Sequence, residues 1–221
     1  MALTDPLTDP AAAVFDLDGT LVDTEPRNRV LWSRLFDAHG VTYDDALIHS
    51  FAGRRGREVL AELAHLFPGR TVEELFTQVM AFEAEPDFPA ADPVPGAVEL
   101  VRRLHGDGVP LALVTSGVRP YAEGLLVELG LDGLLDVVVT ADDVRTGKPD
   151  PEGYLAACSA LGVPPSRAVA FEDAPPGVAA AKAAGMAVVG VSTTVPPELL
   201  SAADRVVPDL RDVRWPHVFG G

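Results

Sequence analysis

Two aspartates, one residue apart, follow a short apolar run near the start of the chain. Asp16 and Asp18 come after residues 11–15, and Gly19 follows them. An apolar run closed by a glycine predicts a buried strand that opens into a loop. Because side chains alternate along a strand, both carboxylates should leave on one side, with Leu17 turned away. Ligands of open α/β sheets bind just beyond the carboxyl ends of strands, so this pair is positioned for chemistry on a ligand.

The same residues also have a purely structural interpretation. Asp-Gly is a common turn signal, and a strand that ends in acidic turn residues needs no function. The pair alone does not separate the two interpretations. Chemistry is favoured only if other strands of the predicted sheet end in groups that suit the same ligand.

Three later segments carry polar groups at the ends of predicted strands or in the loops that follow them. They are Thr115 and Ser116 after the run 111–114, Lys148 in the segment 147–151, and Glu172 and Asp173 after the run 168–171. Hydroxyl and backbone N–H groups hold phosphate oxygens, an ammonium offsets phosphate charge, and carboxylates bind a hard cation such as Mg²⁺. Each segment alone is also explained as a helix cap or a surface turn. Their repetition at successive strand ends favours one phosphate-handling site.

The chain between the first strand and residue 95 predicts helices. Apolar residues recur at roughly helical spacing in the segments 25–39, 44–50, 57–66 and 72–85, which glycine and proline residues separate. A block of helices between the first strand and the remaining strands is typical of an inserted domain. We therefore expect a four-helix cap over residues 23–94, inserted into a core formed by residues 1–22 and 95–221.

From residue 95 onward, helical segments alternate with short apolar runs. The expected strands cover 111–114, 137–139, 168–171, 187–191 and 205–207, and the expected helices cover 97–104, 121–129, 152–161, 178–184 and 198–202. Strands of Val, Leu and Ala that alternate with helices imply a parallel sheet covered on both faces. The expected fold class is therefore α/β, with a Rossmann-like parallel sheet flanked by helices. Residues 215–221 are expected to form a loose tail.

The composition argues against several classes of partner. The 221 residues include 17 basic and 33 acidic ones, a formal charge of -16, which opposes binding to nucleic acid or to an anionic membrane. No apolar run approaches the roughly 20 residues of a membrane span, and no signal peptide is visible, so a cytoplasmic protein is expected. A phosphate ester could bind only where a metal ion and placed basic side chains reverse the local potential. The single cysteine, Cys158, is expected inside a helix rather than as a nucleophile.

The first motif, DLDGTLVDT at residues 16–24, resembles the first motif of the haloacid dehalogenase-like (HAD) hydrolases. The segments around Thr115, Lys148 and Asp173 match the other three motifs of that family in order, and the match covers nearly the whole chain. The stretches TADDVRTGKPDPEGYL and FEDAPPGVAAAKAAGMAVVGVSTT resemble its β-phosphoglucomutase and sugar-phosphatase subfamily, which has a helical cap. They look particularly like the sugar-phosphate and glycerol-3-phosphate phosphatases.

The resemblance implies a role for each of these residues. Asp16 would be the nucleophile that accepts the phosphoryl group as an acyl phosphate, and Asp18 the general acid and base. The other implied contacts are phosphoryl binding by Thr115 and Ser116, charge neutralisation by Lys148, and a Mg²⁺ cofactor held by Asp16, Asp173, Glu172 and the backbone carbonyl of Asp18. The cap would close over the site, where Arg54 or Arg55 would contact the substrate. A solvated helix start is the alternative for these arginines.

The leading hypothesis is a magnesium-dependent phosphatase that hydrolyses a small sugar or polyol phosphate through an aspartyl phosphate. The nearest rival is a phosphosugar mutase of the β-phosphoglucomutase type, in which a bound sugar hydroxyl rather than water receives the phosphoryl group. A noncatalytic metabolite-binding domain is a third interpretation, and the intact set of site residues argues against it. The expected partner is a small phosphorylated metabolite and neither nucleic acid nor membrane. A monomer is expected, with a dimer as the alternative.

Overall fold

The central strand of the core, β1 (Ala12–Phe15), is apolar along its whole length. The computed structural model describes residues 10–85 and 87–219. In it, β1 pairs in parallel with β4 (Leu111–Val114) on one side and with β6 (Ala168–Glu172) on the other. Phe15 stacks on Phe171 of β6, with ring centroids 4.7 Å apart. Helices cover both faces of β1, which is why its sequence shows no polar alternation.

Among the described residues, six parallel strands form the main sheet, in the order β5-β4-β1-β6-β7-β8. The outer strands are β5 (Val137–Val139), β7 (Ala187–Val191) and β8 (Arg205–Val207). The chain moves outward from β1 through β4 and β5, then crosses back to β6 and moves outward on the other side. A sheet of this kind binds its ligand beyond the carboxyl ends of the strands where the order reverses, which here is beside β1. The predicted parallel α/β sheet is confirmed.

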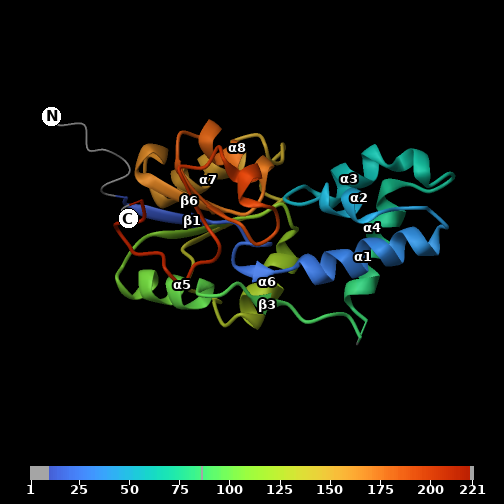
Figure 1. Ribbon diagram of the computed structural model, residues 1–221, viewed down its shortest axis with the longest axis horizontal. Coiled ribbons are helices and arrows are strands. Elements are labelled where there is room, and N and C mark those ends of the chain that lie inside the picture. The colour runs from blue at the N-terminus through green and yellow to red at the C-terminus, as the bar shows by residue number, and fades with distance from the viewer. Residues whose placement is uncertain (1–9, 86, 220–221) are drawn as a thin grey trace.

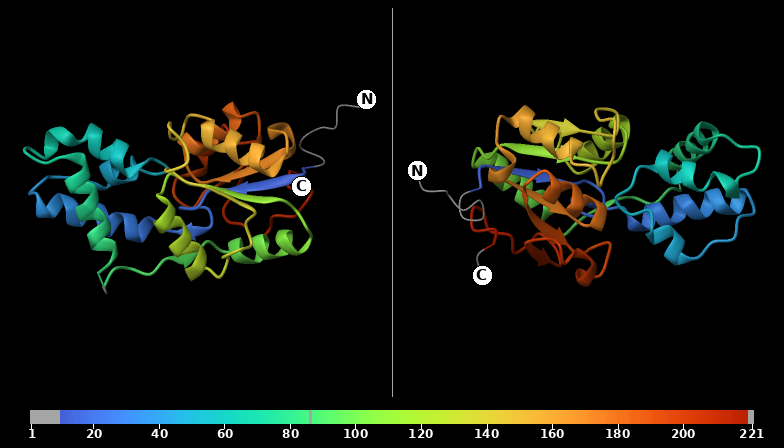
Figure 2. Two further views of the ribbon diagram at one scale, coloured as in Figure 1. Left: turned by 180° about the vertical axis from the view of Figure 1, so that it is seen from behind. Right: turned by 90° about the horizontal axis from the view of Figure 1, so that it is seen from above.

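Helices cover both faces of the sheet, as Figures 1 and 2 show. The helices α5 (Ala97–Gly106) and α6 (Arg119–Glu128) pack with Ala13 and Phe15 on one face. The helices α7 (Glu152–Leu161) and α8 (Pro175–Ala183) pack with Ala12 and Val14 on the other. Cys158 is buried inside α7, as predicted. Within the part of the chain that the structure describes, no helix has the length and apolar character that a membrane span requires.

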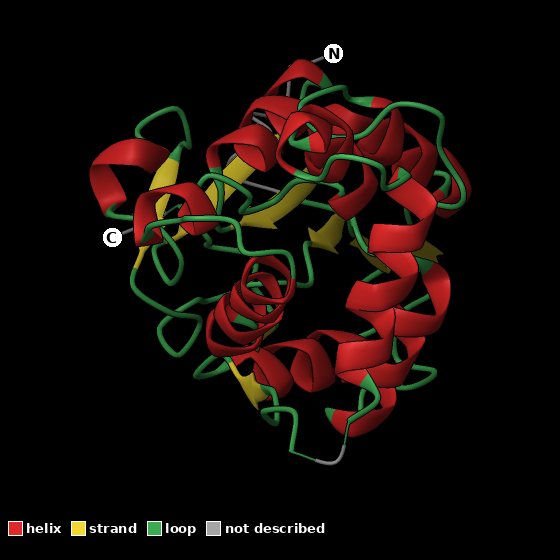
Figure 3. Ribbon diagram, turned by 90° about the vertical axis from the view of Figure 1, so that its right-hand side faces the viewer, coloured by secondary structure: helices red, strands yellow, loops and turns green. Residues whose placement is uncertain are grey.

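The helices between β1 and β4 form a bundle of their own. They are α1 (Glu25–Ala38), α2 (Asp45–His49), α3 (Gly56–Glu62), the 3₁₀ helix η1 (Ala64–Leu66) and α4 (Val72–Glu83). Their buried side chains make a separate hydrophobic cluster that includes the aromatic rings of Trp32, Phe36 and Phe51. The bundle lies beside the core, and in Figure 3 its helices stand in front of the strands. The separate cluster supports the division into a core of residues 1–22 and 95–221 and a cap of residues 23–94, which stays a prediction.

The two connections between this bundle and the core pair with each other. The strands β2 (Val22–Asp23) and β3 (Asp92–Pro93) form a short antiparallel ladder, in which Val22 lies opposite Pro93. Neither strand is visible in the sequence pattern, because two residues are too few to show alternation and proline cannot donate a ladder hydrogen bond. The ladder holds the two crossings side by side.

Two local predictions are wrong. The segment 198–202 does not form the expected α-helix, because the structure has the 3₁₀ helix η3 (Pro197–Leu200) there. A second short 3₁₀ helix of the core is η2 (Pro165–Arg167). The segment 215–219 is not a loose tail, because Val218 is fully buried and Trp215 and Phe219 pack against the core. Burial of these apolar side chains offsets the entropy that a free tail would keep. Residues 220–221 lie outside the described residues.

Gly96, where the chain returns from the cap to α5, has no room for a side chain. Its φ is +84°, and a Cβ there would overlap backbone atoms of Leu210 and Arg211. We expect Gly96→Ala to lower the free energy of unfolding by about 2–4 kcal/mol, because left-handed strain and overpacking add. Urea denaturation followed by circular dichroism measures the change.

The matched control for this prediction is Gly106→Ala at the other end of α5. A Cβ at Gly106 would meet no atom within 4 Å, and its backbone is not left-handed. This variant should be unchanged or up to about 1 kcal/mol more stable, because alanine favours the helix. Equal stability of the two variants would mean that the segment at Arg211 moves aside without cost, and the prediction would be wrong.

Candidate active site

The strand ends that the sequence singles out converge on one buried site. Asp16 follows β1, Thr115 follows β4, and Glu172 and Asp173 stand at the end of β6, where the strand order reverses. Lys148 lies in the loop between β5 and α7 and reaches Asp16. All five side chains are buried. The structure therefore brings together polar groups that lie far apart in the sequence.

Lys148 is the positive centre of this site. Its Nζ donates to Oδ1 of Asp16 and forms an ion pair with Oε1 of Glu172 at 2.6 Å. Burial by itself would lower the pKa of Lys148, but the Asp16 and Glu172 carboxylates outweigh burial and raise the pKa above its usual value. The Tyr154 hydroxyl of α7 donates to the same oxygen of Glu172. Lys148 is therefore a charged ammonium held between two carboxylates.

Asp16, Glu172 and Asp173 form a cluster in which one carboxylate oxygen of each residue lies within 4.8 Å of the others. Burial raises the pKa of Asp16 well above its usual range, against the opposing effect of Lys148. Burial, together with the charge of Glu172, raises the pKa of Asp173 to about 8. Glu172 Oε2 and Asp173 Oδ1 are buried and have no hydrogen-bond partner among the residues that the structure describes. These oxygens fit a hard divalent cation, which would supply positive charge that one ammonium does not.

Two glycines allow the carboxylates to lie this close together. A Cβ at Gly19, whose φ is +77°, would overlap the Asp173 carboxylate and the Thr194 hydroxyl. A Cβ at Gly177 would overlap the Glu172 carboxylate. The first motif and the segment after β6 therefore contribute backbone room as well as acidic groups.

The helix-cap interpretations of the polar residues are wrong. The helix α6 begins after Val118 and α8 begins after Ala174, and no side-chain hydrogen bond caps either helix. Thr115 Oγ1 instead accepts a hydrogen bond from the Gly117 N–H at 3.0 Å. Asp173 belongs to the carboxylate cluster. These side chains are therefore not needed to start the helices that follow them.

Asp18 lies beside the carboxylate cluster rather than in it. Both Asp16 and Asp18 line a cavity between the core and the cap, whereas Leu17 is buried in the core, as the alternation predicts. The Tyr121 hydroxyl of α6 donates to Asp18 Oδ1 at 2.5 Å, and burial raises the pKa of Tyr121 well above its usual value. Sequence reasoning missed Tyr121, because one tyrosine in a helix carries no motif or periodic signal. The Mg²⁺ contact expected from the Asp18 backbone carbonyl stays a prediction.

The cavity has a volume of about 270 Å³. Asp16, Asp18 and Tyr121 line it from the core, and the cap supplies the opposite side. The cap lines it with apolar side chains and with polar or charged ones: Leu31, Trp32, Ile48, Phe51, Phe76, Val79 and Met80, then Glu25, Asn28, Arg54, Arg55, Arg57, Glu58 and Glu83. Apolar walls with placed polar groups are typical of a small-molecule site.

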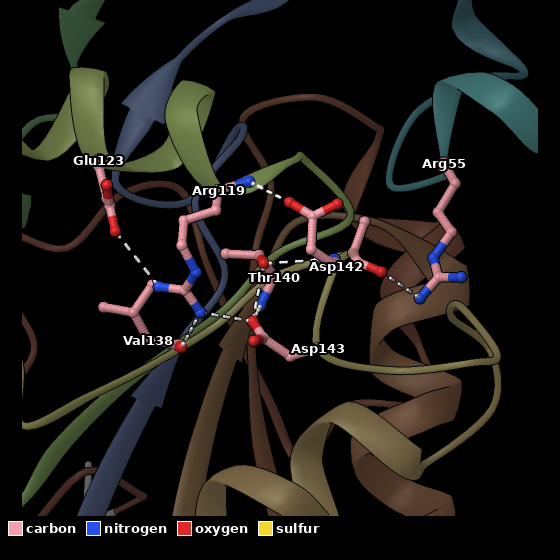
Figure 4. Close-up of polar contacts among 8 residues, drawn as sticks. Arg55, Arg119, Glu123, Val138, Thr140, Asp142 and Asp143 are labelled. Carbon is pink, nitrogen blue, oxygen red and sulfur yellow. Dashed lines mark hydrogen bonds and ion pairs between the residues drawn. The ribbon is translucent and has the colours of Figure 1, made fainter. Parts of the chain in front are cut away.

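Hydrogen bonds cross from the cap to the core at the edge of this cavity. The Ser116 hydroxyl donates to the Gly53 carbonyl at 2.9 Å. Arg55, in the turn before α3, reaches the core loop 141–145 and donates to three of its backbone carbonyls at 3.0–3.3 Å. Figure 4 shows the Arg55 side chain extending from the cap to this loop. On the other side of the loop, Arg119 of α6 donates hydrogen bonds to the carboxylates of Asp142 and Asp143. The cap is therefore fastened to the core beside the site.

The substrate contact expected from Arg54 or Arg55 stays a prediction. Both residues line the cavity, but Arg54 pairs with Glu62 and Arg55 is engaged by carbonyl oxygens. Their neighbour Arg57 pairs with Glu73 at 2.9 Å and lies over the Phe76 ring. Groups of the protein therefore contact each of these guanidinium groups, but Arg55 Nε is buried and has no hydrogen-bond partner among the described residues.

Comparison with known proteins gives an independent view of the chain. A family model described as haloacid dehalogenase-like hydrolase matches residues 10–185. The validoxylamine A 7'-phosphate phosphatase of Streptomyces hygroscopicus subsp. limoneus is 54% identical over 206 residues, which cover 93% of this chain and 97% of the relative. The hexitol phosphatase A of Escherichia coli K12 is 34% identical over 203 residues, which cover 90% of this chain and 91% of the relative.

Among solved structures, the β-phosphoglucomutase of Clostridium difficile has the same fold. Its TM-score is 0.78 at 24% sequence identity, with 93% of this chain and 94% of that chain covered. The family model spans both the first motif and the segment that supplies Glu172 and Asp173. The chain therefore belongs to the haloacid dehalogenase-like hydrolase family, as a hydrolase of phosphoric monoesters.

Proposed function

We propose that this chain is a magnesium-dependent phosphatase that hydrolyses a small sugar or polyol phosphate through an aspartyl phosphate on Asp16. The observation that carries the proposal is the surroundings of Asp16. Its carboxylate contacts the Lys148 ammonium, belongs to a cluster with Glu172 and Asp173, and also lines the cavity. An anionic ester can approach a carboxylate there because positive charge at the site offsets the repulsion.

The first step is the attack of Asp16 on phosphorus. Lys148 holds Oδ1 of Asp16, which leaves Oδ2 as the attacking atom. A bond forms between Oδ2 and phosphorus while the bond from phosphorus to the ester oxygen breaks, and Asp18 gives its proton to the departing alkoxide. Thr115, at the end of β4, binds the phosphoryl oxygens through its hydroxyl, and backbone N–H groups there, including that of Ser116, contribute as well, because the Ser116 hydroxyl donates to the Gly53 carbonyl.

The second step reverses the role of Asp18. The ionised Asp18 takes a proton from a water molecule that attacks phosphorus, and the bond between Asp16 and phosphorus breaks to release phosphate. The Tyr121 hydroxyl holds the Asp18 carboxylate in place for both steps. Asp16, Glu172 and Asp173 would hold a Mg²⁺ ion, whose charge would stabilise the phosphoryl group during transfer.

The substrate class rests on the cavity and on the relatives. A volume of about 270 Å³ lies just below the roughly 300–1,000 Å³ of pockets for drug-sized ligands, so the cavity suits a small alcohol. The rings of Trp32, Phe51 and Phe76 can pack against the C–H face of a sugar or polyol, and Asn28 can bond its hydroxyls. One relative is a validoxylamine A 7'-phosphate phosphatase and another is a hexitol phosphatase, which supports a polyhydroxylated phosphate ester.

The direct test of the function is a panel of sugar and polyol phosphates incubated with the protein and Mg²⁺. We expect release of inorganic phosphate, because water is the acceptor in the second step. β-Glucose 1-phosphate is included because a mutase would convert it to glucose 6-phosphate without releasing phosphate. Formation of glucose 6-phosphate would favour the mutase, and no reaction with any ester would favour a noncatalytic binding domain.

Asp16→Asn and Asp18→Asn test the two catalytic roles. Each should lower Mg²⁺-dependent phosphate release by at least about 10³-fold, because an amide is neither a nucleophile nor a general acid and base. Circular dichroism should show the fold intact. The control is Asp37→Asn, on the exposed face of α1, which should keep full activity.

Undiminished hydrolysis by either variant would remove that residue from its role. The Asp18 variant also separates the two steps. An Asp18→Asn protein that becomes phosphorylated at the normal rate but does not release phosphate would show that the acid role of Asp18 is dispensable.

The metal site is tested by thermal unfolding as well as by activity. Mg²⁺ at about 100 times its dissociation constant should raise the Tm by about 5–10 °C, because the ion binds the folded carboxylate cluster and not the unfolded chain. Asp173→Asn should lose most of this rise, and Asp37→Asn should keep it. An unchanged rise in Asp173→Asn would place the ion at other ligands.

A further inference from the structure

Glu83 is an acidic side chain in the cavity that the catalytic steps do not use. It is the last residue of α4, it is half-buried, and it lines the same cavity as Asp18. Within residues 10–85 and 87–219, its carboxyl group forms no hydrogen bond and no ion pair. The cation whose charge acts on it is Arg27, which itself lies 3.7 Å from a Glu128 oxygen and over the Phe88 ring. A partly buried carboxyl group without a partner needs a reason.

The basic groups around the cavity do not supply that partner. Arg54 pairs with Glu62, and Arg57 pairs with Glu73; neither of these glutamates lines the cavity. Arg55 donates to backbone carbonyls of the core loop. The cap arginines are therefore held at the cavity wall by other groups.

The acidic side chains that line the cavity have fewer positively charged partners than the arginines have negatively charged ones. Asp18 accepts a hydrogen bond from the neutral Tyr121 hydroxyl, and Glu25 lies 3.0 Å from His49. Burial raises the pKa of Glu83 to about 7, with Asp18 adding to the rise and Arg27 opposing it. A cation bound in the cavity would favour the ionised form of Glu83. A neutral polyol would bring no positive charge to Glu83.

We propose that Glu83 binds a positively charged nitrogen in the alcohol part of the substrate, so that the preferred substrates are aminated sugar or polyol phosphates. The inference rests on the proposed phosphatase function, since it names the substrate class of the same site. Such a substrate carries opposite charges at its two ends. The phosphate meets Lys148 and the metal, and the ammonium meets Glu83 in a charge-assisted hydrogen bond. The aromatic wall of the cap packs against the carbon skeleton between them.

The test compares pairs of esters that differ only by an amine in place of a hydroxyl. The pairs are glucosamine 6-phosphate with glucose 6-phosphate, and glucosamine 1-phosphate with glucose 1-phosphate. For at least one pair, kcat/KM of the parent protein should favour the amine by about tenfold or more, as a charge-assisted hydrogen bond allows. Glu83→Gln should lower kcat/KM for the amine ester several-fold more than for the hydroxyl ester, which brings that preference to within about threefold.

Two further variants make the comparison specific. Glu83→Asp keeps the charge and should keep a preference for the amine, which a merely structural role of Glu83 would not produce. The matched control is Glu85→Gln, two residues further along, where the carboxylate is exposed and pairs with Arg34. This variant should behave as the parent protein does. Circular dichroism of each variant checks that the fold is kept.

A binding measurement separates this inference from the phosphatase function. Calorimetry with Asp16→Asn, which cannot turn the esters over, should give a Kd about tenfold lower for the amine of the preferred pair, and Glu83→Gln in that background should remove the difference. No phosphate release from any ester, with the binding preference intact, would overturn the phosphatase and leave this inference standing. Equal rates and equal affinities in both pairs, or an equal loss for amine and hydroxyl esters in Glu83→Gln, would overturn this inference alone.

Discussion

The buried ion group around Lys148 is the constraint on which the rest of the structure depends. Three buried carboxylates, Asp16, Glu172 and Asp173, lie together, and one ammonium contacts two of them. Buried charges are costly unless they are paired and hydrogen-bonded. A buried ion group that served stability alone would pair each carboxylate with a positive charge. The excess of carboxylates and the two oxygens without partners fit a site whose charge is completed by a divalent ion and an anionic substrate.

Backbone geometry makes this concentration of charge feasible. Because β1 and β6 are hydrogen-bonded neighbours, the residues at their carboxyl ends start side by side. Gly19 and Gly177 leave the space into which the neighbouring carboxylates fit. The Tyr154 hydroxyl keeps Glu172 oriented towards Lys148. Each of these features lies in the core, so the residues proposed to carry out phosphoryl transfer are assembled at the edge of its sheet.

In the proposed function, the cap contributes substrate selection rather than phosphoryl chemistry. It covers the carboxylates with apolar and polar side chains, and the contacts of Ser116 and Arg55 fasten it beside the site. The antiparallel pair of β2 and β3 holds the two chain crossings side by side. Water exclusion under such a cover strengthens the electrostatic interactions inside it. In the proposed function, the alcohol part of the substrate would be recognised by side chains that line the cavity, such as Asn28 and Glu83.

The sequence by itself determined the order and type of the elements and the identity of the central site residues. Apolar runs mark the buried strands because burial on both faces of a parallel sheet requires continuous hydrophobicity, and the polar residues that end those runs are therefore the ones at the sheet edge. Only the tertiary structure decided which cap side chains face the cavity, that Arg55 bonds carbonyls of the core, and that Tyr121 meets Asp18. It also decided that the end of the chain packs against the core at Val218. These contacts join residues that are distant in the sequence, and they depend on how the elements pack, which no local pattern of residues encodes.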